Sequence, residues 1–345
     1  MKSKDPIILD LTQSRIGSFL SCPRKEYYQY RAATCGLERD APYIPFLEGE
    51  FGHYALAHYH RKGRMLRSNL LKKIERIQER LREDYGKAYT PEIDNKIRKS
   101  LAAISGACLG YKVRYASDAE RYEVLFVEEP FQVELDVKVN KETYRVVLQG
   151  KIDRVMRDKE TDQIIFWENK FLASLPKDSY TAVPLNLQGL IYCLGAQSLM
   201  EGEMPDARQW DFIIKSKLSI KQTKGGVESL AEFENRVTQQ YLDEPEKKFF
   251  RFPPQIVHKV VINNVVKQLS TVIGDMAATQ AGDREAYMNW NSCLGIYGQA
   301  CPFIHACKSK LLNHKDGWDA AENQGMYRKK IALHEELMED KDGEK

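Results

Sequence analysis

Residues 144–171 constrain the fold of this chain more than any other stretch, because they have the pattern of a β-hairpin. A β-rich run ends near Arg157, a polar turn occupies 158–162, and the apolar run QIIFWENKF follows. Two runs of β-branched and aromatic residues separated by a polar turn are typical of paired antiparallel strands. We therefore expect two neighbouring strands that are buried in a sheet.

Three charged residues lie in or beside this apolar hairpin: Asp153, Glu168 and Lys170. Burying an ionised side chain costs on the order of several kcal/mol unless it is paired or binds a metal ion. Alternation along a strand places Glu168 and Lys170 on one face, and Asp153 can lie beside Glu168 if the strands are neighbours. Two such carboxylates can hold Mg²⁺ or Mn²⁺, and a lysine can orient an attacking water. The alternative is a surface hairpin with solvated charges, since E-x-K alone is common.

Length and composition describe an ordinary soluble globular protein of one large domain or two smaller ones. Of the 345 residues, 43% are hydrophobic and 29% charged, and the net charge of +3 does not by itself indicate a polyanionic partner. The sequence has no apolar run of about 18 residues that could span a membrane. The N-terminus also lacks the apolar core of a signal peptide, so we expect a cytoplasmic protein. In a reducing compartment, seven cysteines indicate free thiols or metal ligands.

Hydrophobic periodicity predicts helices, then a cluster of strands followed by a helix, and then helices again. This order indicates an α/β (α+β) fold with a helical insertion. The predicted elements are helices at 61–85 and 91–121, strands within 124–171, a helix at 185–200, a strand at 210–215, helices at 229–248 and 255–280, and an irregular cysteine-bearing stretch at 290–314.

Four short motifs surround the hairpin charges in a fixed order. They are G-x-x-x-H at 49–53, G-x-x-D at 150–153, E-x-K at 168–170 and Q-x-x-x-Y at 188–192. Each is weak alone, but the set resembles the signature of the PD-(D/E)XK nucleases, in particular the RecB-like branch. That branch includes nuclease domains of bacterial helicase–nucleases, CRISPR-adaptation exonucleases and many phage exonucleases. The resemblance runs from about residue 14 to residue 307.

The resemblance implies a restriction-endonuclease-like fold, in which helices flank a central mixed sheet. We expect a single nuclease domain over 1–345, with a helical insertion at 54–121 and the nuclease core at 124–216. A C-terminal iron–sulfur region at 290–314 would close onto Cys22.

The resemblance also implies roles for the charged residues. His53, Asp153, Glu168 and the backbone carbonyl of Asn169 would bind Mg²⁺ or Mn²⁺, and Lys170 would act in catalysis with the two carboxylates. On sequence alone, a helical histidine is more often a packed or solvated residue than a metal ligand.

Gln188 and Tyr192 are four residues apart and therefore share one face of a helix. The resemblance places this pair close to the active site, where both would serve catalysis; a helix face with a polar edge is the alternative. Glu129 on the preceding strand is a weaker acidic candidate, and Glu128 serves equally well.

The cysteines form a second group. Cys293, Cys301 and Cys307 have the spacing C-x₇-C-x₅-C, and Cys22 lies far upstream. This arrangement resembles the iron–sulfur members of the branch, in which one early and three late cysteines hold a 4Fe-4S cluster, although a common spacing is C-x₂-C-x₅-C. Four cysteines can also bind structural zinc, and unliganded buried thiols are a third interpretation.

The implied function is that of a metal-dependent DNA nuclease that hydrolyses phosphodiesters. An exonuclease on single-stranded DNA ends is the preferred mode, with a role in recombination, repair or replication and a helicase or recombination protein as possible partner. A non-catalytic nucleic-acid-binding or scaffold protein and an RNA-directed nuclease are the alternatives. The segment 61–84 holds nine Lys or Arg against four acids and could follow a phosphate backbone, although such a helix is usually a solvated face.

Overall fold

The computed structural model describes residues 8–139, 142–223, 226–294, 300–312, 325–330 and 333. They divide into two compact units. Unit 1 comprises Met1–Asp40, Pro130–Lys151 and Lys259–Lys345, and unit 2 comprises Ala41–Glu129 and Ile152–His258. Strands β3 (Tyr122–Val139) and β4 (Glu142–Asp158) each contribute residues to both units. Across the described part of the chain, no helix is both long and apolar enough to cross a membrane.

A mixed β-sheet underlies the fold. Its strand order is β1-β4-β5-β6-β10, with β3 paired to β4 and β9 paired to β6. Strand β5 runs antiparallel to β4 and parallel to β6. This mixed sheet with flanking helices confirms the expected restriction-endonuclease-like class. The remaining strands of the sheet are β1 (Ile8–Leu11), β5 (Ile164–Leu172), β6 (Ala207–Ile214), β9 (Phe249–Arg251) and β10 (Gln255–Ile256).

The predicted hairpin is confirmed as β4 and β5. Their register extends from the Arg157–Ile164 pair to the Arg154–Trp167 pair. The first six residues of β5 are all buried, as expected for a strand that has a neighbour on each side and is covered on both faces. Asp153 and Glu168 therefore do lie in the interior of the sheet, whereas Lys170 is partly exposed.

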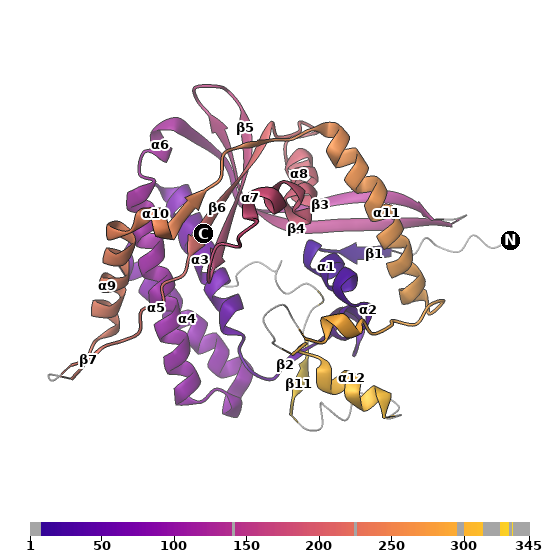
Figure 1. Cartoon of the computed structure of the whole chain (residues 1–345), viewed down its shortest axis with the longest axis horizontal. Coiled ribbons are helices and arrows are strands. Elements are labelled where there is room, and N and C mark those ends of the chain that lie inside the picture. Colours follow the sequence, from indigo (N-terminus) through magenta and orange to yellow (C-terminus); the bar gives the residue numbers. More distant parts are fainter. Residues whose placement is uncertain are drawn as a thin grey trace. The chain divides into compact units, whose positions relative to one another are not determined.

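Helices form most of unit 2, and α3, α4, α5 and α9 pack together there (Figure 1). Helices α5 and α9 approach closely because α5 carries glycine at the contact; a Cβ at Gly110 would come within 2.6 Å of the Tyr241 Cβ. The helical and small elements of unit 2 are α3 (Ile44–Lys62), α4 (Arg67–Tyr85), η2 (Gly86–Ala88), α5 (Pro91–Arg114), α6 (Asp118–Arg121), α7 (Ser179–Ala182), η3 (Val183–Leu185), α8 (Leu187–Leu199), β7 (Gln222–Thr223), β8 (Gly226–Val227), α9 (Leu230–Asp243) and α10 (Pro245–Lys248).

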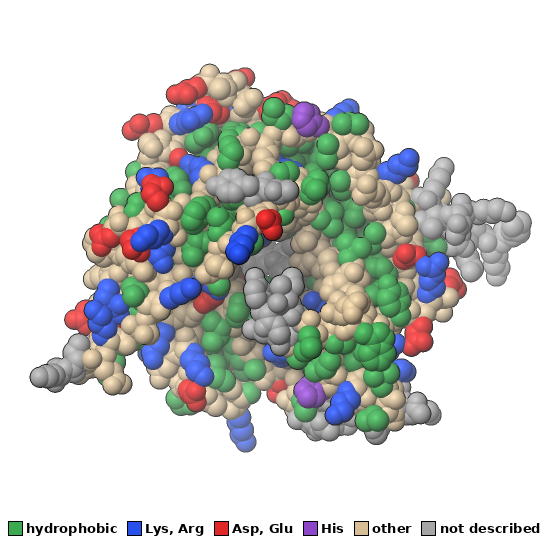
Figure 2. Space-filling model, viewed as in Figure 1, with side chains coloured by type: hydrophobic (Ala, Val, Ile, Leu, Met, Phe, Trp, Pro, Cys, Tyr) green, Lys and Arg blue, Asp and Glu red, His purple; other side chains and the backbone are tan. Residues whose placement is uncertain are grey.

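The basic segment 61–84 falls largely on α4, where several cations are paired with acids. Arg67 contacts Glu234, and Arg80 lies 2.9 Å from Glu50. Figure 2 shows basic and acidic side chains mixed over the visible face of the helices of unit 2. This mixture matches the solvated-face interpretation better than a continuous basic track.

Unit 1 contains a small core around Tyr28, Leu37, Phe303 and Cys307. Helix α12 and the β2–β11 pair lie beside each other in Figure 1. The elements of unit 1 outside the main sheet are α1 (Gln13–Ser21), α2 (Pro23–Glu26), the π-helix η1 (Tyr27–Arg31), β2 (Leu37–Arg39), α11 (Lys259–Ala281), η4 (Trp290–Ser292), α12 (Ile304–Leu311) and β11 (Tyr327–Lys329).

Some predicted bounds differ from the structure, since the helix predicted at 61–85 begins at Arg67 and the one predicted at 91–121 ends at Arg114. Two further predictions were wrong in the type of element. The stretch 290–314 is not irregular throughout, because residues 304–311 form α12, whose Ala306 and Cys307 pack into the unit 1 core. The helix predicted at 255–280 begins at Lys259, because Gln255 and Ile256 pair with β6 as strand β10. In both cases, tertiary contacts absent from the local pattern decide the structure.

Candidate metal centre

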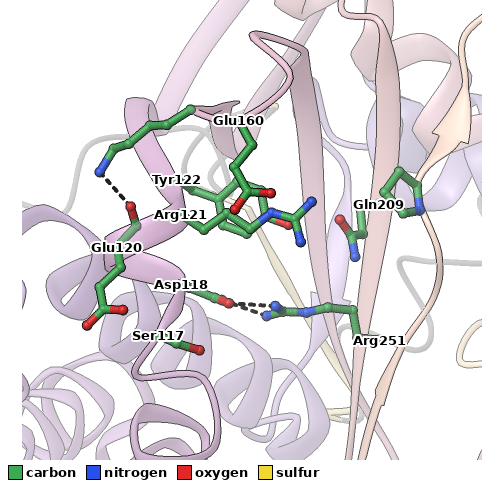
Figure 3. Close-up of a pocket in the computed structure, with 10 residues that line it drawn as sticks. Ser117, Asp118, Glu120, Arg121, Tyr122, Glu160, Gln209 and Arg251 are labelled. Atoms are coloured by element: carbon green, nitrogen blue, oxygen red, sulfur yellow. Dashed lines mark hydrogen bonds and ion pairs between the residues drawn. The ribbon is translucent and has the colours of Figure 1, made fainter.

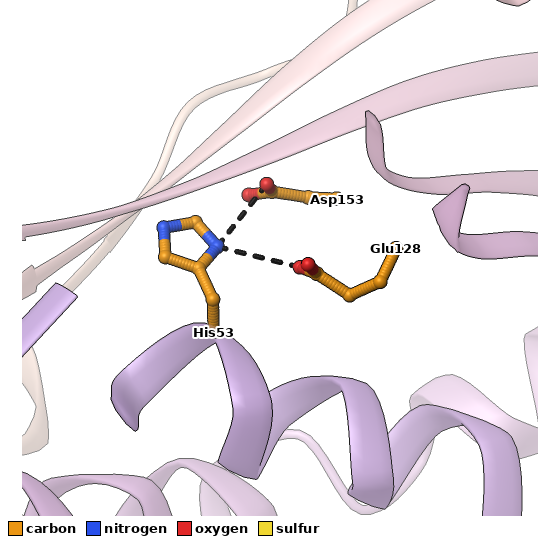
Figure 4. A group of neighbouring side chains, drawn as sticks. All are labelled: His53, Glu128 and Asp153. Atoms are coloured by element: carbon orange, nitrogen blue, oxygen red, sulfur yellow. Dashed lines mark ion pairs between the residues drawn. The ribbon is translucent and has the colours of Figure 1, made fainter. Parts of the chain in front are cut away.

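Three side chains from separate elements of unit 2 meet at one point: His53 of α3, Glu128 of β3 and Asp153 of β4 (Figure 4). One ligand atom from each lies within 4.8 Å of the others. His53 Nδ1 is 3.1 Å from Asp153 Oδ1 and 3.6 Å from Glu128 Oε1. An imidazole and two carboxylates form a suitable donor set for a divalent cation such as Mn²⁺ or Mg²⁺.

Asp153 sits where the two hairpin strands cease to pair directly. The register of β4 with β5 extends to Arg154 and Trp167, and one residue further the Asp153 Oδ2 accepts the backbone N–H of Asn169 at 2.7 Å. Asp153 is 8% exposed. The Asp153 side chain thus takes the place of a backbone carbonyl as the acceptor for the Asn169 N–H at the end of the β4–β5 pairing. The other carboxylate oxygen of Asp153 faces His53.

Glu168 is the most deeply buried acid of the hairpin, at 1% exposure. Its Oε1 accepts hydrogen bonds from Lys170 Nζ at 2.6 Å and from Gln188 Nε2 at 2.8 Å. Among the described residues its Oε2 is buried and has no hydrogen-bond partner. A buried carboxylate oxygen without a donor is costly, and a bound cation would satisfy it. The residues present therefore fit a divalent metal ion.

The charges at this site are strongly coupled. Burial and the carboxylate of Asp153 raise the pKa of Glu168, although Lys170 and His53 partly offset the shift. Burial works against an imidazolium at His53, but Asp153 and Glu128 outweigh it and raise the pKa of His53 to about 10. In the metal-free protein, a protonated His53 thus supplies positive charge to the carboxylates. Metal binding through this nitrogen must displace that proton.

Lys170 keeps its charge in this setting. Burial alone would lower the pKa of Lys170, yet the carboxylates of Glu168 and Asp153 raise it above the ordinary lysine value. The side chain is 31% exposed, so the ammonium is held by Glu168 while still reaching the surface.

Of the two neighbouring acids Glu128 and Glu129, the one that lies at the metal centre is Glu128. Its backbone φ is +49°, a left-handed conformation that is uncommon for a non-glycine residue in a strand. A left-handed backbone changes the direction in which the side chain points. It costs about 1–3 kcal/mol of conformational free energy, and such strained residues are concentrated at functional sites. Glu129 is exposed and does not join the cluster. Spacing could not distinguish the two, because the local turn of the strand decides which one faces inward.

Gly52 allows α3 to carry His53 close to strand β5. A Cβ at Gly52 would lie 2.3 Å from the ring of Phe171, so the helix could not come as near with any other residue. At Gly49, the first residue of the G-x-x-x-H motif, a Cβ would meet nothing within 4 Å among the described residues.

We expect Gly52→Ala to destabilise the fold by about 1–3 kcal/mol, as overpacked core substitutions do, and to lower metal-dependent activity by displacing His53. The matched control is Gly49→Ala on the same helix, which should be neutral or stabilise by up to about 1 kcal/mol. Thermal melting and Mn²⁺ titration of both variants check this. Equal behaviour of the two would contradict the close approach.

Gln188 and Tyr192 both lie on α8, as the spacing predicted. Gln188 reaches Glu168 directly, whereas the Tyr192 ring packs 5.9 Å from that of Phe166. Burial, with Glu168 and Asp153 nearby, raises the pKa of Tyr192, so its hydroxyl stays protonated. Gln188 therefore holds one oxygen of Glu168 in place, and Tyr192 borders the same site.

The structure also gathers the four predicted cysteines within unit 1. The backbone N–H of Asn289 donates to Cys22 Sγ at 3.3 Å, and the N–H of Cys301 donates to the carbonyl of Cys293 at 2.8 Å. Burial raises the pKa of Cys307 to about 12, and the neighbouring thiols Cys301, Cys22 and Cys293 add to that rise. Residues more than 250 positions apart in sequence thus converge.

The family model of the PD-(D/E)XK nuclease superfamily matches residues 10–308. The chain belongs to this superfamily. A search of curated proteins finds no match. The family and the His53, Glu128 and Asp153 cluster together indicate a metal-dependent nuclease.

Proposed function

We propose that the protein is a deoxyribonuclease of the RecB-like branch that uses Mg²⁺ or Mn²⁺ and degrades DNA from single-stranded ends. The observation that best supports a hydrolytic role is the buried Oε2 of Glu168. Among the described residues this oxygen has no hydrogen-bond partner, and Glu168 is electrostatically coupled to Asp153 and His53 of the cluster. Most buried polar atoms in folded proteins have a hydrogen-bond partner, so a buried carboxylate oxygen without a donor calls for an explanation such as a bound cation. Action on DNA ends, and a role in recombination, repair or replication with a helicase or recombination partner, rest on the resemblance alone.

In this proposal each residue has a distinct task. His53, Asp153, Glu168, the Asn169 carbonyl and Glu128 would hold the cation. When bound there, a divalent cation would supply Lewis-acid chemistry, polarising the phosphodiester and lowering the pKa of water. Lys170, fixed by its ion pair with Glu168, orients the attacking water and offsets negative charge that develops on the phosphate.

Gln188 acts through Glu168 rather than on the substrate itself. Its amide restrains Oε1 of Glu168, which would leave Oε2 available to a cation. Tyr192 borders the same carboxylate and contributes to the wall of the site.

The experiment that tests this function is digestion of end-labelled single-stranded DNA, duplex DNA and RNA by purified protein, with Mg²⁺, Mn²⁺ or EDTA. We expect metal-dependent loss of single-stranded DNA from its ends. Cleavage of RNA alone would favour the RNA-directed alternative. No cleavage of any substrate by metal-loaded protein would favour a non-catalytic binding protein and overturn the proposal.

We also propose that Cys22, Cys293, Cys301 and Cys307 bind a 4Fe-4S cluster that ties the two ends of unit 1 together. The convergence of the four thiols supports this proposal, since Cys301, Cys22 and Cys293 all raise the pKa of Cys307. Structural zinc bound by the same four cysteines is the alternative. Cys108 and Cys193 are buried elsewhere, in unit 2, and have no place in the cluster.

Anaerobically purified protein should be brown and contain about four iron atoms per chain. We expect Cys301→Ser to lose most of the iron and to melt at a lower temperature, because the cluster would join distant parts of unit 1. Cys35→Ser is the matched control, since Cys35 belongs to the same unit but not to the group of four. A colourless wild type with stoichiometric zinc, or equal iron loss in both variants, would contradict the cluster.

A further inference from the structure

Arg154 is a buried guanidinium directly after the predicted metal ligand Asp153. Because side chains alternate along a strand, these two consecutive residues project to opposite faces of β4. Arg154 is 1% exposed and stacks over its register partner Trp167, with 4.7 Å between the guanidinium carbon and the ring centroid. Burying a guanidinium to this extent costs free energy unless it is paired and hydrogen-bonded.

The guanidinium of Arg154 connects three neighbouring strands. Its Nη1 donates to the Asn169 Oδ1 on β5 at 3.0 Å, and its Nη2 donates to the Asp211 Oδ2 on β6 at 3.1 Å. Nη2 also lies 3.1 Å from the hydroxyl of Tyr111 on α5. Asn169 and Asp211 are register partners, so Arg154 holds β4 in position against a pair of strands already in register.

The network that surrounds Arg154 is close to neutral. Arg251 binds Asp211 on one side, at 2.9 Å, and Asp118 on the other, at 2.8 Å, so two guanidiniums face two carboxylates. Burial alone would raise the pKa of Asp211, but Arg251 and Arg154 hold it below its usual value. Charge balance of this kind makes a buried arginine tolerable.

The outer end of the network opens on a hollow of about 520 Å³, which Asp118, Arg251 and Gln209 help to line (Figure 3). The lining residues include no predicted metal ligand. Arg251 binds Asp211 and Asp118, whereas Arg154 binds Asn169, the residue whose N–H contacts Asp153.

The contact with Asn169 connects Arg154 to the metal centre. The backbone N–H of Asn169 donates to Asp153 Oδ2 at 2.7 Å, and its side-chain Nδ2 lies 3.5 Å from the same oxygen. Arg154 holds the other end of that side-chain amide, at Oδ1. The guanidinium thereby holds the side-chain amide with its Nδ2 on the side of Asp153.

We propose that Arg154 is a positioning residue for the metal centre, acting through Asn169 on the carboxylate of Asp153. The inference rests on the proposed metal-dependent function. Partners that orient a metal ligand from behind typically contribute 10- to 100-fold in metal affinity.

The test compares Arg154→Lys with Arg251→Lys by calorimetric titration of Mn²⁺ into metal-free protein, without substrate. Both changes keep the network charge and replace a branched donor by a single ammonium, which cannot hold two partners in the same way. We expect Arg154→Lys to weaken Mn²⁺ binding at least about tenfold. Arg251→Lys should lower the melting temperature similarly but change the Mn²⁺ affinity less than about threefold, because Arg251 does not contact Asn169.

A second variant keeps the test decisive if Arg154→Lys folds poorly. Asn169→Ala removes the same contact from the other side, and the double variant should bind Mn²⁺ no more weakly than the weaker single variant. Equal affinities for wild type, Arg154→Lys and Asn169→Ala would overturn the inference and leave the metal centre intact. Failure of the wild type to bind Mn²⁺ would instead overturn the proposed function, and the inference with it.

Discussion

Asp153→Asn is expected to abolish Mg²⁺- and Mn²⁺-dependent DNA cleavage, with a loss of at least about three orders of magnitude, since a bound metal contributes several kcal/mol to the transition state. The change removes one charge but keeps an oxygen that can accept the N–H of Asn169. The variant should therefore fold. Single-turnover cleavage of end-labelled DNA over a metal titration measures the loss.

The same variant separates a lost metal site from a damaged fold. Wild-type protein should gain thermal stability as Mn²⁺ is added, because an ion that binds only the folded state stabilises it by mass action. Asp153→Asn should show little of that gain. The matched control is Asp162→Asn in the exposed turn of the same hairpin, which should retain both cleavage and the thermal shift. Full activity of Asp153→Asn would be incompatible with the assigned centre.

Lys170→Met is expected to reduce the rate of cleavage by about two to four orders of magnitude while Mn²⁺ binding persists. Methionine keeps the length and apolar stem of the side chain but removes the ammonium that lies 2.6 Å from Glu168. A positioned catalytic group typically contributes about 10²–10⁴-fold to the rate. The loss should appear in the single-turnover rate at saturating metal rather than in metal affinity.

Lys170→Arg is the informative companion variant. It keeps the positive charge, so it should fold and bind Mn²⁺ like the methionine variant, but it should recover only part of the rate because the guanidinium is larger and differently shaped. An unchanged rate for Lys170→Met would remove Lys170 from the mechanism. A loss of metal binding together with activity would make its role structural instead.

The hairpin and its charges could be predicted from the sequence because they depend on local pattern. Alternating apolar residues and a polar turn define β4 and β5, and a two-residue spacing places Glu168 and Lys170 on one face. The family resemblance implied that His53 and Gln188 would lie near these carboxylates. In the structure His53 is 3.1 Å from Asp153, and Gln188 donates to Glu168.

Other features depend on tertiary contacts that no short pattern carries. The left-handed backbone at Glu128 selects that acid over Glu129. The close approach of α3 requires glycine at position 52 because Phe171 lies opposite it, whereas the motif emphasises Gly49. The role of Arg154 could not be predicted from the sequence, since its hydrogen-bond partners come from three other elements.

The two elements that the sequence did not predict, α12 and β10, also depend on tertiary contacts. Residues 304–311 have little helical signal alone, but Ala306 and Cys307 find partners in the unit 1 core and α12 forms. Strand β10 exists because β6 offers an edge to Gln255 and Ile256. The predicted domain limits and the roles of the site residues remain predictions.

We propose that His53, Glu128, Asp153 and Glu168 together hold one divalent cation. Anomalous diffraction from crystals soaked in Mn²⁺ can locate this ion. We expect an anomalous peak within coordination distance of His53 Nδ1, Asp153 Oδ1 and Glu168 Oε2. Crystals at saturating Mn²⁺ that show no peak at these atoms, or a peak only elsewhere in the molecule, would contradict it.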